Sequence, residues 1–163
     1  CPRGPANGTK ALAAGLRLWA WTREFAKNAK DSEGRKLGQS QRHGVAFPLA
    51  DALSGLMAAR CFYSDILFLS QNGKDHPVVG PELESYLNTF NDLLGTIAAN
   101  VVGEAARVCA EIVYGFDAAT DEEKAAFAAL RAQTDAALSG TRLAKDRAAK
   151  CLTTIMIPEA LDY

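Results

Sequence analysis

Few residues of this sequence have the type and spacing that catalysis or metal binding requires. The two histidines, His43 and His76, both fall in stretches that we predict to be loops. A di-iron site in a helical bundle takes two Glu-x-x-His pairs, and the sequence contains none. The motifs of zinc hydrolases, serine nucleophile elbows, P-loops and dinucleotide-binding strands are also absent. We therefore predict neither a metal site nor a catalytic residue within this chain.

Charged residues instead recur at helical spacing. Glu104 and Arg107 are three residues apart, and Arg107 and Glu111 are four apart, which is typical of ion pairs on a helix surface. A second, largely basic group fits either a solvated helix face or a patch that meets an anionic ligand or another subunit. This group comprises Arg142, Lys145, Asp146, Arg147 and Lys150.

The composition indicates a globular chain that does not have nucleic acid as a main partner. The 163 residues suit one domain, and 48% hydrophobic with 23% charged residues is ordinary for a folded protein. The net charge of −1 argues against nucleic acid as a main partner, because phosphate binding needs a concentrated basic surface. No uninterrupted apolar run reaches the roughly 18 residues of a membrane span, so we expect no span.

The cysteines favour a reducing compartment. Cys61, Cys109 and Cys151 lie among apolar residues without the Cys-x-x-Cys spacing of a zinc site, so we interpret them as small buried hydrophobes of a cytoplasmic protein. The sequence starts at Cys1 rather than at a methionine. We therefore expect a processed chain or a fragment of a larger protein.

We predict four helical segments, and these must position any functional site of the chain. Apolar residues recur at intervals of three and four over about 8–29, 48–73, 80–115 and 120–158, and a Gly- and Ser-rich loop covers 30–44. No stretch alternates with the period of two that a half-buried strand requires. The longest predicted stripe consists of Leu83, Leu87, Phe90, Leu94, Ile97, Val101, Val108 and Ile112.

Local signals mark where these helices begin. Pro48 suits the first turn of the second helix, because proline there loses no hydrogen bond. Gly80 and Pro81 open the third helix. Thr120 followed by Glu123 predicts a capping box at the start of the fourth helix.

These elements predict an all-α protein, an antiparallel four-helix up-down bundle that forms a single domain over residues 1–163. The second and third helices are long for a compact domain. Long, alanine-rich helices often pack against a second copy or a missing domain, and a free-standing bundle is the alternative.

Three stretches of the sequence carry a family resemblance. TREFA, residues 22–26, is similar to an Arg-x-x-Phe-Gly motif, and LADALSGLMAAR, residues 49–60, to a helix that reads Leu-Ala-Asp-Met and then Ala-Ala-Arg. Residues 103–116 look like a helix that leads into a Gln-x-x-Gly-Gly turn. In this order, over about residues 8–116, they resemble the C-terminal helical domain of acyl-CoA dehydrogenases.

The resemblance implies a place in a larger flavoprotein. The full-length enzyme is expected to use FAD in the α,β-dehydrogenation of acyl-CoA thioesters, and to form a homo-oligomer, a dimer or tetramer, with FAD at the subunit interface. This domain would supply oligomer contacts and part of the FAD site. Gln39 is a weaker match than Gln41 for the family's glutamine. The cofactor-binding residues that the resemblance implies are Arg23, Gln41, Glu111, Tyr114 and Gly115.

The chain departs from the family pattern at several positions. Phe25 is displaced by one residue from the motif phenylalanine, and the loop after it is longer than usual. Glu111 stands where a glutamine is expected, and Tyr114 replaces a glycine whose smallness lets backbone approach the cofactor. The loop that carries the catalytic base in many members is missing after residue 116, and Glu24 does not match the base of the others. No catalytic glutamate is assigned.

Two further functions remain open. The chain could be a non-catalytic four-helix-bundle module that binds a partner through an exposed apolar stripe, in which case Arg23 is an ordinary surface residue. It could also be a sensor bundle with a small-ligand pocket between its helices, formed by Trp19, Trp21, Phe62 and Tyr63.

Overall fold

The computed structural model describes residues 7–39 and 41–156, and this part of the chain is helical. Its helices are α1 (Asn7–Asn28), α2 (His43–Asn72), α3 (Leu83–Gly115), α4 (Asp121–Ala137) and α5 (Thr141–Met156). Two short 3-10 helices, η1 (Gly73–Asp75) and η2 (Gly80–Glu82), join α2 to α3. In these ranges there is no strand, only an isolated bridge between Lys30 and Lys36.

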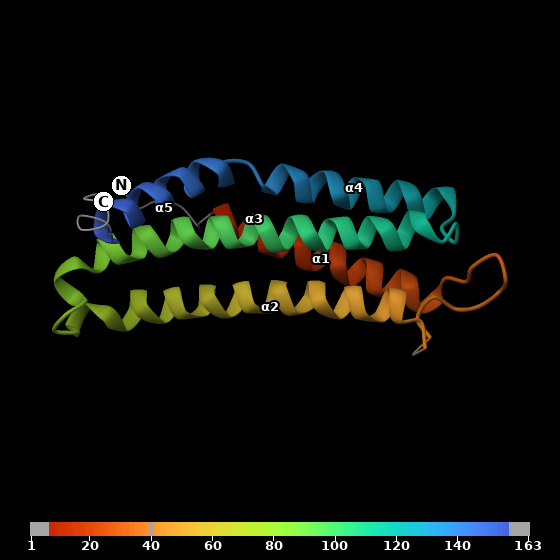
Figure 1. The fold of residues 1–163 in the computed structure, drawn as a ribbon, viewed down its shortest axis with the longest axis horizontal. Coiled ribbons are helices and arrows are strands. Elements are labelled where there is room, and N and C mark those ends of the chain that lie inside the picture. Colours follow the sequence, from red (N-terminus) through yellow and green to blue (C-terminus); the bar gives the residue numbers. More distant parts are fainter. Residues whose placement is uncertain (1–6, 40, 157–163) are drawn as a thin grey trace, which may run out of the picture.

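The helices form an elongated bundle in which consecutive arms reverse direction (Figure 1). The central helix is α3, which packs against α1, α2 and α5, while α4 lies mainly on α1. Figure 1 shows α4 and α5 following one another as the fourth arm of the bundle. The predicted all-helical fold of four long arms is therefore confirmed.

The fourth arm is not the single helix that we predicted. It breaks between Ala137 and Thr141, where Gly140 has a φ of 80°. This left-handed conformation is accessible to glycine at low cost and commonly ends a helix. Thr141 Oγ1 then donates to the Leu138 carbonyl at 2.7 Å, which ties the new helix to the end of the old one. The predicted end near residue 158 lies outside the described residues.

The predicted start of the second helix is also wrong. α2 begins at His43, so Pro48 lies inside the helix rather than in its first turn. The proline leaves the carbonyl of Gly44 without its helical donor. This loss costs little because Gly44 is exposed and water can take the donor's place. The predicted capping box is confirmed, with Thr120 Oγ1 accepting from the Glu123 amide and the Glu123 carboxylate accepting from the Thr120 amide.

Small residues bring the central helices close together. A Cβ at Gly8 would lie 3.0 Å from the Leu94 carbonyl oxygen, and a Cβ at Gly95 would lie 3.0 Å from the Cβ of Ala144. The core face of α3 consequently differs from the predicted stripe. Ile97 is 37% exposed, whereas the fully buried positions in the middle of α3 are Ala98, Val102 and Ala105.

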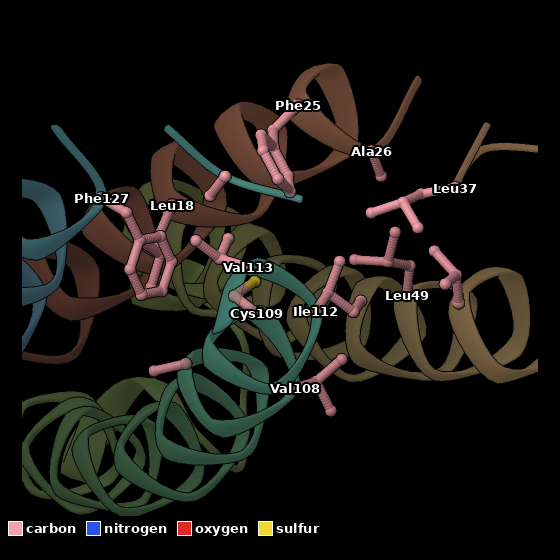
Figure 2. Close-up of a cluster of buried hydrophobic side chains, with 13 residues drawn as sticks. Leu18, Phe25, Ala26, Leu37, Leu49, Val108, Cys109, Ile112, Val113 and Phe127 are labelled. Atoms are coloured by element: carbon pink, nitrogen blue, oxygen red, sulfur yellow. The ribbon is translucent and has the colours of Figure 1, made fainter. Parts of the chain in front are cut away.

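The cysteine prediction holds for one of three residues. Cys109 is fully buried in the core cluster of Figure 2, whereas Cys61 is exposed and Cys151 is half-buried. The Cys61 position faces away from the bundle because the helix turns its buried side, which carries Leu56 and Ala59, toward α3.

Two stretches of the described chain are long and apolar enough to cross a membrane, His43–Asp75 and Gly80–Gly115. Length and composition alone do not separate such helices from the core helices of a soluble protein, and this pair packs together within the bundle.

Candidate functional site

A groove of about 390 Å³ lies where the end of α1, the α1–α2 loop and the start of α2 meet. Its volume falls in the range of pockets that hold small molecules. Helix α1 contributes Trp19, Arg23 and Lys27, and the loop contributes its turn at 37–39. The wall on the side of α2 is formed by Val45, Ala46, Leu49, Ala50 and Leu53.

The α1 rim of the groove carries two cations. Arg23 and Lys27 are four residues apart, so they lie one turn apart on the same face of the helix. Lys27 Nζ is 3.6 Å from Glu24 Oε1, which offsets part of its charge. Arg23 is exposed and makes no ion pair or side-chain hydrogen bond within the described residues, so its guanidinium is available to a ligand.

The floor of the groove is apolar and connects to the core. Leu37 and Leu49 are buried, and Figure 2 shows them facing one another between the loop and α2, with Ile112 of α3 beside Leu49. Trp19 Nε1 donates to the Leu49 carbonyl at 2.8 Å, which fixes the indole ring at the edge of this floor. An aromatic ring with its polar atom satisfied offers a flat apolar surface to a ligand.

Asp31 fixes the conformation of the α1–α2 loop, which forms one wall of the groove. Its Oδ1 accepts from the backbone amides of Glu33 and Arg35 at 3.0 and 2.9 Å, and its Oδ2 accepts from the side chains of Arg35 and Arg42. Burial by itself would raise the pKa of Asp31, but these hydrogen bonds outweigh it and hold the pKa well below its ordinary value. Neither Asp31 nor Arg42 stands out in the sequence, where only the Asp-x-x-Gly turn at 31–34 indicates an organised loop.

Two of the residues that were named from the family resemblance lie together in the structure. Arg23 and Gln39 line the same groove, although they come from a helix and a loop. Gln41, the stronger match in the sequence, is exposed and does not belong to the residues that line it. Lys27 and Trp19 complete the polar and aromatic parts of the groove.

Glu111, Tyr114 and Gly115 lie outside this groove, on the last turns of α3. Glu111 is exposed and forms an ion pair with Arg107, which also binds Glu104. The hydrogen bonds from Arg107 lower the pKa of Glu104, and the two carboxylates raise the pKa of Arg107. The prediction of surface ion pairs here is confirmed.

Tyr114 packs against α4 rather than facing the groove. Its ring meets the buried ring of Phe127 edge-on at 5.5 Å. Gly115 is exposed, and a Cβ there would meet no neighbour within 4 Å. This glycine is therefore not required by a close backbone approach within the chain.

The basic group on α5 is split between two environments. Arg147 forms a fork onto both carboxylate oxygens of Asp92 in α3, at 2.9 Å from Nε to Oδ2 and 2.6 Å from Nη2 to Oδ1. It therefore belongs to the bundle and not to a free basic patch. Arg142 and Lys145 remain exposed beside a small hollow that Thr96 and Asn100 also line.

The four aromatic residues of the sensor hypothesis do not share a pocket. Trp19 lines the groove, whereas Trp21 stacks on Phe25 on another side of α1. Phe62 and Tyr63 pack against the other half of the core, formed by α2 and α3.

Both histidines contact neighbouring residues of the fold. His43 begins α2 and stacks near Phe47, which corrects its predicted loop position. His76 lies in a turn, where its Nδ1 accepts from the amides of Val78 and Val79. Within residues 7–39 and 41–156, no three His, Cys, Asp or Glu side chains come together as metal ligands would.

Comparisons of the chain with protein-family models, with curated proteins and with solved structures give no match.

Proposed function

We propose that this chain is the helical-bundle part of a FAD-dependent acyl-CoA dehydrogenase, and that the groove beside Arg23 holds the diphosphate end of the cofactor. The observation that carries this proposal is the meeting of Arg23 and Gln39 at one groove whose edge is an ordered tryptophan. The resemblance of residues 22–26 and 49–60 to family motifs suggests the family, and the groove suggests where the cofactor binds.

The side chains of the groove fit an anionic group joined to a flat ring. A guanidinium can donate two parallel hydrogen bonds to phosphate oxygens, so Arg23 suits the diphosphate, and Lys27 adds a second positive charge. Trp19 and the apolar floor suit an aromatic ring. Gln39 can donate to, or accept from, a sugar or ring atom.

FAD supplies hydride acceptance in this class of enzyme. The residues of this chain bind and orient the cofactor, and the proposal assigns none of them a proton-transfer role. Glu111 does not line the groove and is held by Arg107, so its carboxylate does not oppose a diphosphate at Arg23. A cofactor role for Glu111, Tyr114 and Gly115 rests on the resemblance alone.

We also propose that the protein is a homo-oligomer, a dimer or tetramer. The solvent-exposed surface of α2 supports this proposal, because it carries large apolar side chains that a partner would cover. These are Phe47, Met57, Leu67 and Phe68. The same surface favours a second candidate function, a non-catalytic interaction module.

Nucleotide titration of the full chain tests the proposal. We expect ADP and FAD to bind, and riboflavin, which lacks the diphosphate, to bind much more weakly. Arg23→Ala should weaken ADP binding by roughly 10- to 150-fold, since a hydrogen bond to a charged group contributes about 1.5–3 kcal/mol. Arg17→Ala is the matched control, because Arg17 is an exposed arginine of the same helix outside the groove.

Absence of ADP and FAD binding, or an equal loss in both arginine variants, would overturn the cofactor proposal. An oligomer in sedimentation equilibrium that binds neither nucleotide would instead support the interaction module.

A further inference from the structure

The loop between α1 and α2 is tied to the start of α2 by a nearly buried ion pair. The side chains of Asp31 and Arg42 are 9% and 16% exposed, unlike the other ion pairs of this loop. Asp31 holds the loop's own turn through the amides of Glu33 and Arg35. Arg42 immediately precedes α2, so the pair joins the loop to the start of that helix.

Arg42 also connects the loop to the end of α3. Its guanidinium carbon lies 5.4 Å from the centre of the Phe116 ring, within the range of a cation–π contact. We call Asp31, Arg42 and Phe116 the loop clasp. The backbone amide of Arg42 donates to the carbonyl of Gln39 at 2.9 Å, so the clasp is attached directly to the residue that lines the groove.

Two contacts hold the loop wall at residues 37–39 close to the end of α1. Leu37 is fully buried, and its amide donates to the Ala29 carbonyl at 3.0 Å. A Cβ at Gly38 would lie 2.9 Å from the Cα of Lys27, a distance that real side chains essentially never show. The wall therefore has little freedom on its α1 side, and the clasp sets its position on the α2 side.

We propose that the loop clasp holds Gln39, and the loop wall that carries it, in position opposite Arg23. The groove then has the shape that binds a diphosphate ligand before the ligand arrives. The ligand class rests on the function proposed above. Groups that contact a ligand must be held to within about 0.5 Å by residues around them, and ordering them in advance removes a cost from binding. Asp31 and Arg42 touch no ligand in this proposal, so they are positioning residues.

Three variants separate the clasp from the rest of the loop. Asp31→Asn keeps an oxygen for the amides of Glu33 and Arg35 but loses the charge that holds Arg42. Gly38→Ala displaces the same wall from its other side. Glu33→Gln is the matched control, because Glu33 is an exposed carboxylate of the same loop that forms an ion pair with Arg35 and does not belong to the clasp.

ADP affinity and thermal unfolding are measured together on the full chain. We expect Asp31→Asn and Gly38→Ala to weaken ADP binding about fivefold, and Glu33→Gln to bind as the unmodified chain does. If Asp31→Asn lowers the unfolding temperature and leaves ADP affinity unchanged, the clasp is only structural and the proposal is overturned.

A ligand-free measurement keeps this proposal separate from the proposed function. The chain has two tryptophans, so Trp21→Phe leaves Trp19 as the only tryptophan, at the groove. In that background, acrylamide should quench Trp19 fluorescence more strongly when Asp31→Asn is added. If the unmodified chain binds no ADP, the cofactor proposal fails, and this quenching decides the clasp: unchanged quenching overturns it and increased quenching supports it.

Discussion

The Cβ that an alanine would carry at position 15 would lie 2.9 Å from Cγ2 of Val102, so Gly15 allows α1 to pack closely on the middle of α3. Leu56 of α2 is also close, with its Cδ2 3.3 Å away. We expect Gly15→Ala to destabilise the chain by about 1–3 kcal/mol, because overpacking forces the helices apart. Thermal unfolding followed by circular dichroism measures the effect.

Gly103 provides the control for this prediction. It lies in the same helix as Val102, it is exposed, and a Cβ there would meet nothing within 4 Å. Gly103→Ala should leave stability unchanged or raise it by up to about 1 kcal/mol, since alanine favours the helix. Adding Val102→Ala to Gly15→Ala should cost less than the sum of the single changes, because the two sites share one contact. Equal stability of the Gly15 and Gly103 variants would contradict the close contact.

The ionised form of Asp31 should stabilise the fold in a pH-dependent way. Because its pKa is lowered in the folded chain, the contribution is fully present above the ordinary value near 4 and is lost as the pH falls below it. Within the described residues, the groups that donate to this carboxylate are the side chains of Arg35 and Arg42 and the amides of Glu33 and Arg35. We expect Asp31→Asn to lower the free energy of unfolding by a constant amount between about pH 5 and pH 8.

Below about pH 4 the difference between the variant and the unmodified chain should shrink, because Asp31 of the unfolded chain then takes up a proton while the folded chain still holds it ionised. Urea unfolding at several pH values checks this trend. A difference that grows with acid would show that Asp31 is not held in its ionised form.

The fork of Arg147 onto Asp92 should contribute modestly to stability. The hydrogen bonds to Asp92 raise the pKa of Arg147, but its side chain is 46% exposed, so water screens the pair. Arg147→Lys keeps the charge and loses the two-pronged geometry, and we expect a loss of about 0.5–1 kcal/mol in denaturant unfolding. Arg142→Lys, at an exposed position of the same helix, should have no effect. Identical losses would mean that the fork has no special role.

Two cysteines should differ in their reactivity with iodoacetamide. Cys61 is exposed on α2, whereas Cys109 is fully buried and its burial raises the pKa of its thiol, partly offset by a hydrogen bond with Thr22. Peptide mass mapping at mildly alkaline pH should find Cys61 modified and Cys109 unmodified in the folded chain. In urea both should react, and modification of Cys109 without urea would indicate that the core opens.

Local sequence signals predicted the presence of the helices more accurately than they predicted which face of each helix is buried. The capping box at Thr120 was predicted correctly because it depends on residues three apart. The break at Gly140 also has a local signal, a glycine followed by threonine, but the apolar pattern of the flanking residues continues through it. The predicted stripe included Ile97 and missed Ala98, because periodicity does not show which side of a helix its neighbours cover when small residues allow close packing.

By itself, the sequence determined the all-helical class of the fold, and it offered Arg23 as a candidate for anion binding. Helical periodicity and caps act over a few residues, so four arms could be predicted, and the TREFA motif brought out Arg23. Tertiary structure decided which side chains line a groove together with Arg23. Gln39 rather than Gln41 lines the groove because the loop folds back through Asp31, Arg42 and Phe116, and contacts between residues so far apart in the chain leave no periodic signal in the sequence.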